Sequence, residues 1–592
     1  MTDPGKIRLP RPGAGREPAA SALLAWLTDP RAPRVCVLTG PTGAGKSHLL
    51  AWLVNHGEAS ASAGSRWRVH AVAPLAGGVS VRGAAWLLAD DLGAVARAPA
   101  ELLNILARDT RPTVLVVSDL HEAAAPDALL DQLLLPIARL SHVKLIIESR
   151  TAEPCTALLL DARPDSAVMD LAESQWTDPD GFRAWAATAV PGRSAAPADA
   201  YPVPGRVVGH VPAPRVPPVS ASTVDAMLEA DPYAVTAALE QDERTGEPAG
   251  DLRRAWLRAG QALCVAATPS ARALTLLAAL DDSADPVLRQ RLAAVADPEP
   301  WRVIAVRSRE ATTRWAGPVA ALAPGRGELA GTVLSADHLG EVHVLDSGDG
   351  SVRGRLPGGE RRPARSVFCL PEGTVAVLDD WGGIGLVHRA KPAVTGLGSL
   401  VAPEPDPWEA LRAAMLSAAA DLSAETELTV ATALPDGVAF GDARGRVHVL
   451  TRDNATSGPV SRTLHDGPVQ ALTAHALGAD GPTLLHSGGQ DGRVRAWGPS
   501  AEPLADAVRE RTVPVSALSS GPEPDALAVA WADGHVEHTA LDSGRRIAFR
   551  PGPPVRALWC AGGRLAVGMD EAIVLMEARS AARIPQRTII RG

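Results

Sequence analysis

Four residues near the N-terminus carry the strongest chemical signal in this sequence. Gly40, Gly45, Lys46 and Ser47 match the pattern G-x-x-x-x-G-K-S. Glycines let the backbone turn closely around a phosphate chain, the lysine supplies a compact cation, and the serine hydroxyl can bind Mg²⁺. The pattern therefore predicts a site for ATP with Mg²⁺. The residues expected to contact the nucleotide are Gly40, Pro41, Thr42, Gly43, Ala44, Gly45, Lys46 and Ser47.

The sequence on either side of this loop supports a phosphate site. An apolar run at Val35–Leu38 predicts a buried strand before the loop, and the apolar run that follows Ser47 predicts a helix. The N-terminus of a helix adds the positive end of its dipole to a phosphate site. A chance glycine-rich turn is the alternative, and it would lack this strand–loop–helix context.

A second apolar run, Thr113–Val117, ends in acidic residues. Carboxylates at a strand tip beside a phosphate loop can hold a metal ion and can orient or deprotonate an attacking water. We expect Asp119, together with Ser47, to serve the metal, and Glu122 to activate the water. The register is open by one residue, because Ser118 at the metal position would favour binding over hydrolysis. A solvated turn after a core strand is the alternative.

A third apolar run, Val143–Ile147, is followed closely by Arg150. An arginine at the same edge of the sheet can sense or neutralise a γ-phosphate, so Arg150 is a candidate catalytic residue. The alternative is a solvated arginine that pairs with Glu148 or Asp161. His121 is expected to be a turn residue.

Composition narrows the class of protein. The chain has 592 residues, a net charge of −9 and five well-separated cysteines. This charge gives no support to nucleic-acid binding, and the cysteine spacing favours reduced thiols over disulfides or a zinc site. No apolar run is long enough for a membrane-spanning helix, so we expect a cytoplasmic protein. The preference for arginine over lysine, with abundant Ala, Gly and Pro, is associated with GC-rich bacterial genomes of the actinobacterial type.

The chain changes character along its length. Alternating strands and helices give way to a proline-rich stretch, then to helical spacing, then to short strands between Gly- and Asp-rich turns. The fold class is therefore multidomain, with α/β, all-α and all-β parts. The expected divisions are a P-loop NTPase domain of parallel αβα type at 1–190, a Pro-rich linker at 191–222, a small helical domain at 223–298 and a β-propeller at 299–592.

A turn followed by an apolar strand recurs through the C-terminal half, mostly about every 40 residues, which is the period of propeller blades. The recurring stretches are 338–345, 380–387, 443–450, 490–497, 532–539 and 569–576. Six blades are therefore expected, and a seventh, closed by residues near Trp301–Thr313, stays open as an alternative.

One blade is similar to a WD repeat, in the stretch Leu485–Trp497 that ends in Asp-Gly-Arg-Val-Arg-Ala-Trp. The resemblance implies a hydrogen-bond network within the blade, formed by His465, Ser487, Asp491 and Trp497. Gly498 stands where the family usually has an aspartate, so the propeller is a divergent one.

The N-terminal motifs, taken in order, resemble those of STAND-type NTPases, the signal-transducing branch of the AAA+-like phosphate-loop proteins. They are Gly-Arg-Glu at 15–17, the phosphate loop, Asp-Leu-His-Glu-Ala at 119–123 and Glu-Ser-Arg at 148–150. The resemblance covers about residues 12–190 and implies that Arg16 approaches the nucleotide and Arg150 its phosphate end. His121 stands where the family often has a second acid, and the helical segment has no clear Gly-x-Pro motif. Nucleotide binding is therefore better supported than hydrolysis.

The resemblance implies an intracellular signal-transduction switch that binds ATP and hydrolyses it slowly, with a propeller that binds a partner protein or ligand. Its output would come from a separate effector protein or from nucleotide-dependent homo-oligomerisation. The alternative is a non-catalytic WD-repeat scaffold with a structural nucleotide; ATP turnover that disappears in Lys46→Ala would separate the two. A GTPase is disfavoured because no Asn-Lys-x-Asp segment is present.

Overall fold

The computed structural model divides into two compact units, Met1–Ala249 and Gly250–Gly592. This boundary falls within the segment 223–298, for which the sequence predicts one helical domain. The predicted linker 191–222 lies outside the described residues. The structure describes residues 12–61, 69–188, 223–243, 250–308, 318–357, 362–388, 406, 408–477, 481–521 and 526–579.

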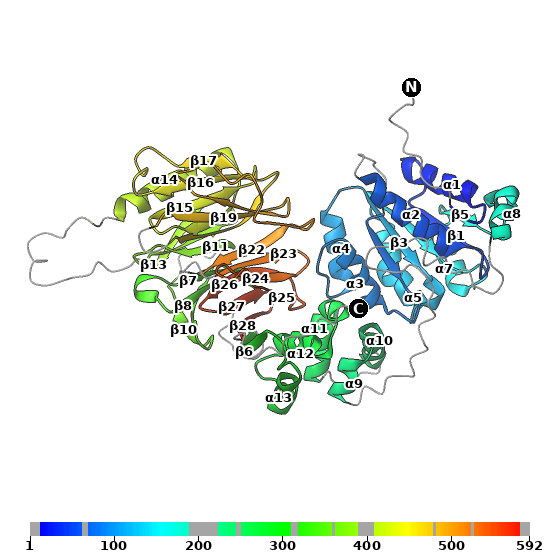
Figure 1. Ribbon diagram of the computed structural model, residues 1–592, viewed down its shortest axis with the longest axis horizontal. Helices are drawn as coiled ribbons and strands as arrows, with labels where there is room; N and C mark the ends of the chain where they lie inside the picture. The colour runs from blue at the N-terminus through cyan, green and yellow to red at the C-terminus, as the bar shows by residue number, and fades with distance from the viewer. Residues whose placement is uncertain are drawn as a thin grey trace, which may run out of the picture. The chain divides into compact units, whose positions relative to one another are not determined.

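The first unit is built on a parallel five-stranded sheet in the order β2-β3-β4-β1-β5, which confirms the predicted α/β sheet (Figure 1). Its central strands are mostly apolar and buried along their whole length because helices cover both faces. The sequence did not reveal the edge strand β5, which is short and partly exposed. The strands are β1 (Val35–Thr39), β2 (Ala71–Pro74), β3 (Thr113–Ser118), β4 (Val143–Glu148) and β5 (Ala167–Asp170).

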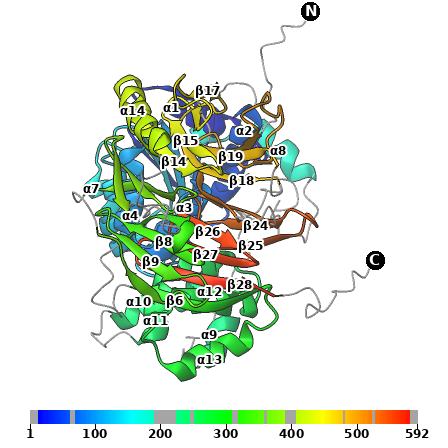
Figure 2. The same cartoon turned by 90° about the vertical axis from the view of Figure 1, so that its left-hand side faces the viewer.

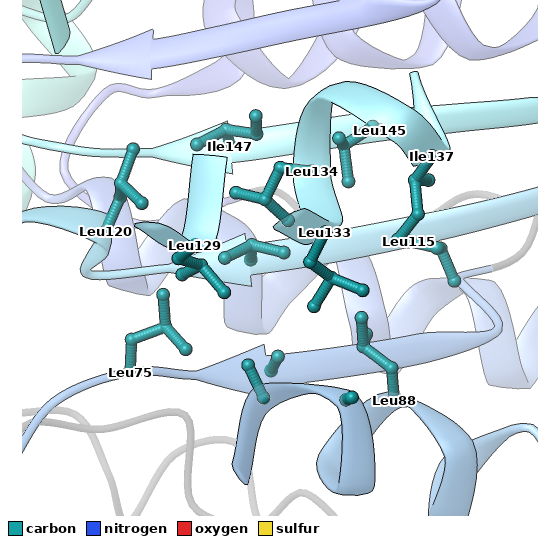
Figure 3. Close-up of a cluster of buried hydrophobic side chains, with 14 of the residues drawn as sticks. Leu75, Leu88, Leu115, Leu120, Leu129, Leu133, Leu134, Ile137, Leu145 and Ile147 are labelled. Atoms are coloured by element: carbon teal, nitrogen blue, oxygen red, sulfur yellow. The ribbon is translucent and has the colours of Figure 1, made fainter. Parts of the chain in front are cut away.

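Two apolar cores lie on the two faces of this sheet, because successive side chains of a strand point to opposite faces. Val116 and Ile146 belong to the core that α1 and α2 cover. Leu115 and Leu145 belong to the other core, where Figure 3 shows them with Leu133. The helical elements of this unit are α1 (Glu17–Thr28), α2 (Lys46–Ala61), α3 (Val81–Asp91), α4 (Pro99–Arg108), η1 (Leu120–Glu122), α5 (Pro126–Leu129), the π-helical η2 (Leu130–Leu134), α6 (Leu135–Ile137), α7 (Pro154–Ala162), η3 (Ser174–Trp176), α8 (Pro179–Thr188), α9 (Val224–Glu229) and α10 (Pro232–Glu243).

The second unit contains six antiparallel sheets within its described residues, arranged as the blades of a propeller (Figures 1 and 2). The innermost strands touch in the cyclic order β7, β11, β14, β18, β22, β26 and back to β7, so the ring is closed. The blades are β7 (Val319–Pro324), β8 (Thr332–Asp337), β9 (Val342–Asp346) and β10 (Val352–Arg355); β11 (Ala364–Cys369), β12 (Val375–Asp379) and β13 (Ile384–His388); β14 (Leu428–Ala433), β15 (Gly437–Asp442), β16 (Arg446–Thr451) and β17 (Val460–Thr463); β18 (Val469–Ala476), β19 (Thr483–Gly489), β20 (Arg493–Trp497) and β21 (Arg509–Glu510); β22 (Val515–Ser520), β23 (Ala526–Trp531), β24 (Val536–Ala540) and β25 (Arg546–Phe549); and β26 (Val555–Ala561), β27 (Arg564–Met569) and β28 (Ala572–Ala578) with β6 (Trp301–Ser308).

The alternative of a seventh blade near Trp301 is wrong for the described residues. Strand β6 instead pairs antiparallel with β28 and becomes the outermost strand of the sixth blade. The first and last strands of the propeller thus share one sheet. Their backbone hydrogen bonds close the ring, so the first and last strands each have a paired neighbour.

The six recurring sequence stretches correspond to the same place in each blade. Each one forms the turn before the third strand and that strand itself, which confirms the predicted repeat. In three blades an aspartate caps the turn by accepting two backbone N–H bonds, as Asp442 does from Arg444 and Arg446, each at 2.9 Å. Asp337 and Asp379 accept the equivalent pairs of bonds.

Every innermost strand carries a register irregularity at its second residue. Such a bulge redirects one side chain and increases the local twist. Five of the six bulge residues line a cavity of about 110 Å³ between the inner strands. The bulge residues are Ala320, Arg365, Thr429, Gln470, Ser516 and Arg556.

The predicted network in the WD-like blade is confirmed for three of its four residues. The ring of His465 is 3.0 Å from the Asp491 carboxylate through Nδ1 and 2.8 Å from Ser487 Oγ through Nε2. Trp497 is not part of it, because its indole N–H donates to the carbonyl of Ala501 at 2.9 Å. Because the indole N–H already donates to a backbone carbonyl, the hydroxyl of Ser487 is left to form its hydrogen bond with the ring of His465.

Helices also pack within the second unit. Helix α12 contacts β6, and Arg258 of α11 pairs with Asp281 at 2.8 Å and with Glu571 of the propeller at 3.2 Å. Helix α14 lies between the second and third blades in the sequence, and its apolar side packs against both of them. The helices of this unit are α11 (Asp251–Val265), α12 (Pro269–Ala279), α13 (Pro286–Val295), η5 (Gly327–Leu329) and α14 (Glu409–Glu425).

We expect Trp301→Ala to destabilise the second unit by about 3–5 kcal/mol, because removing a large buried side chain leaves a cavity. Trp301 on β6 is fully buried, and its ring centroid lies 5.4 Å from that of His538. The change is measured as the shift of the β-rich transition in denaturant unfolding followed by circular dichroism. Trp381→Ala is the matched control, since Trp381 is 68% exposed and its loss should change stability by less than about 0.5 kcal/mol. Equal effects of the two substitutions would contradict the assigned closure.

Candidate functional site

The loop of residues 40–47 leaves the carboxyl end of β1 and leads into α2, as its sequence predicts. Gly40, Gly43 and Gly45 have φ angles of 146°, 81° and 86°, which side chains other than glycine rarely adopt. A Cβ at Gly40 would also lie 3.1 Å from that of Ala44. The loop conformation therefore depends on glycine at these positions.

Two cationic side chains hold this loop in place. The ammonium group of Lys46 donates to the carbonyl oxygens of Gly40 at 2.9 Å and Pro41 at 3.2 Å. The buried guanidinium of Arg16 donates to the carbonyl oxygens of Ala44 and Leu171. Both cations expected near the nucleotide therefore lie against the loop itself.

The region around the loop is suited to an anion. Helix α2 begins at Lys46 and has no acidic residue in its first turn, so no carboxylate there offsets the positive end of its dipole. The apex formed by Pro41, Thr42 and Gly43 is exposed, and Ser47 is partly exposed on the first turn of α2. Backbone N–H groups, an ammonium and a hydroxyl are thus gathered at one edge of the sheet.

Glu148 is the ionic partner of Lys46 among the described residues, and sequence reasoning did not place it there. Its carboxylate lies 3.5 Å from the Lys46 ammonium, and the other carboxylate oxygen accepts a hydrogen bond from the Asp119 amide at 2.6 Å. The glutamate is 1% exposed. An acidic residue at the end of a mostly apolar strand was the sequence signal that could have identified it.

The environment of Glu148 changes its acidity. Burial raises its pKa from 4.5 to about 7, and the nearby negative charge of Asp119 acts in the same direction. The Asp119 amide and the Lys46 ammonium oppose this rise. A carboxyl group that titrates near neutral pH beside a lysine is typical of functional sites.

The acids predicted at the tip of β3 form a separate cluster. Ligand atoms of Asp119, His121 and Glu122 all lie within 4.8 Å of one another. Asp119 adopts a left-handed backbone conformation, with φ 56°, which turns the chain from β3 into η1. The His121 side chain is 4% exposed, and burial together with the charge of Arg150 lowers its pKa. His121 thus lies in the turn after β3, as its sequence predicts.

Arg150 lies at this cluster and not beside Glu148 or Asp161. Its guanidinium donates to the Glu122 carboxylate at 2.8 Å. The structure therefore brings together Asp119, Glu122 and Arg150 in one group, and Arg16, Lys46 and the loop in another. Glu148 contacts both groups, through Lys46 and through the Asp119 amide.

The donor atoms at this edge of the sheet fit Mg²⁺ with a nucleotide. Mg²⁺ prefers oxygen ligands, and it is usually held by one or two carboxylates together with phosphate oxygens and water. Ser47 offers a hydroxyl, and Asp119 and Glu148 offer carboxylates. Ser118 is 1% exposed, and no described residue forms a hydrogen bond with its hydroxyl, so this buried oxygen is also uncommitted.

A second polar site lies at the bulge residues of the propeller. Arg365 pairs with Asp380 at 3.0 Å and with Glu427 at 2.6 Å, and Arg556 pairs with Asp570 at 2.8 Å. On the same turn as Asp380, Trp381 is exposed, with the Arg362 guanidinium 5.8 Å from its ring centroid. Exposed tryptophan beside arginine is a composition enriched in protein interfaces.

Comparisons with known proteins give a limited result. No family model matches the sequence, and no curated protein matches it. Among solved structures, the chain is similar to the β-propeller domain of Cps50 (Swd1) from Myceliophteria thermophila, with 15% identity over 44% of this chain and 83% of that chain and a TM-score of 0.31. No helix in the described part of the chain has the length and hydropathy to span a membrane. None of the five cysteines forms a disulfide.

We expect Glu148 to make stability fall as the pH rises from about 4.5 to 7. Because its pKa is higher in the folded state, the folded protein binds the proton more tightly, and this stabilisation is complete below the unfolded pKa and lost above the folded one. Denaturant unfolding of wild type and Glu148→Gln across this range should diverge by roughly 1–3 kcal/mol. Glutamine mimics the neutral acid, so its curve should be flatter; parallel curves would contradict the raised pKa.

Proposed function

We propose that this protein is an ATP-binding signal-transduction switch of the STAND type, in which the first unit binds Mg·ATP and the propeller binds a partner protein. The observation that carries the proposal is the glycine loop with its positive φ angles, together with Lys46 and the N-terminus of α2 at the carboxyl edge of a parallel sheet. Ligands of open α/β sheets bind at this edge. The proposed nucleotide contacts are Arg16, Gly40, Pro41, Thr42, Gly43, Ala44, Gly45, Lys46 and Ser47.

Hydrolysis in this proposal is slow because the catalytic groups restrain one another. Glu122 is the proposed water-activating base, and it accepts a hydrogen bond from Arg150 in this structure. The guanidinium therefore occupies a carboxylate oxygen that would otherwise accept the proton of the attacking water. The γ-phosphate would have to attract Arg150 away from Glu122 before the base is free. This arrangement suits a switch that persists in its ATP state.

The propeller is the proposed partner-binding part. Its loops are presented by a closed ring of blades, which is a rigid scaffold for a binding surface. Trp381, Arg362 and Arg365 provide an aromatic ring and cations on the second blade. The output is proposed to come from a separate effector protein or from homo-oligomerisation, in the cytoplasm.

A non-catalytic scaffold with a structural nucleotide is the second candidate. The Glu122–Arg150 ion pair favours it, because a base that remains paired would leave bound ATP intact. Both candidates require nucleotide binding, and they differ in turnover. A bound nucleotide would stabilise the folded chain in either case.

We expect Lys46→Ala to weaken binding of a fluorescent ATP analogue roughly 10- to 100-fold, because one charge-assisted contact to the phosphates is lost. Lys46→Arg keeps the charge with a planar head group and should fall between wild type and Lys46→Ala. Phosphate release by wild type that disappears in Lys46→Ala would support the switch, and its absence in wild type would support the scaffold. Unchanged affinity of Lys46→Ala would remove the loop from the proposed site.

We expect Trp381→Ala to lose its partner protein and keep its fold. An exposed tryptophan at an interface typically contributes about 2 kcal/mol or more to binding, which is roughly a thirtyfold loss of affinity. Affinity capture from the native cell by wild type and Trp381→Ala, followed by quantitative mass spectrometry, measures the difference. Val287→Ala is the control, because Val287 is also exposed but lies on α13. A partner retained by both variants would place the binding surface elsewhere.

A further inference from the structure

The order of the strands places one acidic side chain between the phosphate loop and the tip of β3. Strand β4 lies between β1 and β3, and Glu148 is its last residue. Glu148 is paired in register with Leu38 of β1, two residues before Gly40. Any carboxylate at this position therefore lies where the loop begins.

The alternation of side chains fixes the face on which Glu148 emerges. Val117 and Ile147 are paired in register, and both belong to the core under α3. Val116 and Ile146 belong to the opposite core under α2. The next residues, Ser118 and Glu148, therefore point to the face that carries α2, whose first residue is Lys46. The contact of 3.5 Å between Glu148 and Lys46 agrees with this assignment.

Ser118 and Glu148 are complementary neighbours. Both end buried strands, both are 1% exposed, and they occupy the same level of adjacent strands. Two ionised carboxylates at these two positions would repel each other in a buried environment. A serine at position 118 is small and uncharged, so it does not repel a glutamate at position 148. The hydroxyl of Ser118 has no hydrogen-bond partner among the described residues.

We propose that Glu148 is the carboxylate that serves the Mg²⁺ of the bound nucleotide, in place of an acid at the end of β3, where Ser118 stands. This inference rests on the proposed ATP site. Asp119 is less suited to the role, because it follows the strand end in a left-handed turn and its carboxylate clusters with His121 and Glu122. Its backbone amide instead donates to Glu148 and positions that carboxylate.

The competing role for Glu148 is to neutralise Lys46 without a part in metal binding. The two roles predict different effects of magnesium. A metal-serving glutamate should, when removed, weaken binding of Mg·ATP and leave or improve binding of metal-free ATP, because one negative charge near the phosphates is gone. A charge partner should affect both forms alike.

The test measures the affinity of the full-length chain for a fluorescent ATP analogue in Mg²⁺ and in EDTA, and takes the ratio of the two. We expect Glu148→Gln to reduce this ratio about 10- to 100-fold, as removal of a group that supports a metal site does. The double variant Ser118→Asp with Glu148→Gln moves the carboxylate to the adjacent strand and should restore the ratio. Asp119→Asn is measured as the competing candidate. Asp161→Asn, which replaces an exposed acid on α7, is the matched control and should leave the ratio unchanged.

Loss of the ratio in Glu148→Gln with recovery in the double variant would support the proposal. A wild-type ratio in Glu148→Gln, or loss confined to Asp119→Asn, would overturn it. Equal weakening with and without Mg²⁺, with no recovery in the double variant, would assign Glu148 to charge neutralisation and also overturn it. A wild-type chain that binds no ATP analogue would instead refute the proposed function, and this inference with it.

Discussion

The candidate site depends on one buried carboxylate that contacts two parts of the chain. Glu148 lies 3.5 Å from the ammonium of Lys46 and accepts a hydrogen bond from the amide of Asp119, so it links the loop after β1 to the turn after β3. A buried charge is tolerated when it is paired and hydrogen-bonded, and both conditions are met here. Removing either partner would leave the glutamate uncompensated. The positions of the loop lysine and of the strand tip are therefore coupled through a single side chain.

In the first unit, the residues that hold the backbone of the loop are different from the ion-paired residues beside it. Arg16 and Lys46 hold the carbonyl groups of the loop, and the glycines supply backbone angles that other residues rarely adopt. The acids on the turn after β3 form their own group, to which Arg150, just after β4, contributes an ion pair with Glu122. In the second unit, all blades have the same backbone plan, but the residue at the bulge differs between blades. It is alanine in one blade, serine in another and arginine in a third. In both units the candidate functional side chains are placed on a regular backbone frame.

The sequence was sufficient for features with local causes. Apolar runs identified β1, β3 and β4, and the period of about 40 residues identified all six blades, because a strand and its capped turn are determined by nearby residues. The sequence was insufficient for features that depend on contacts between segments far apart in the chain. Strand order determines what Glu148 faces, and pairing across the whole propeller makes β6 part of the sixth blade. The indole N–H of Trp497 donates to a carbonyl in the turn that follows it, and the WD-repeat pattern does not predict this bond. The short strand β5 has too little apolar surface to be recognised.

The shared sheet of β6 and β28 has a consequence for the order of synthesis. Strand β6 leaves the ribosome before every other strand of the propeller, and its partner leaves last. Pairing between segments so far apart in the chain is slow, since the loop between them must first be ordered. Throughout translation of the blades the nascent ring is therefore open, with an unpaired edge that can associate with other chains. This edge acquires its native partner only after β28, the final strand, has emerged.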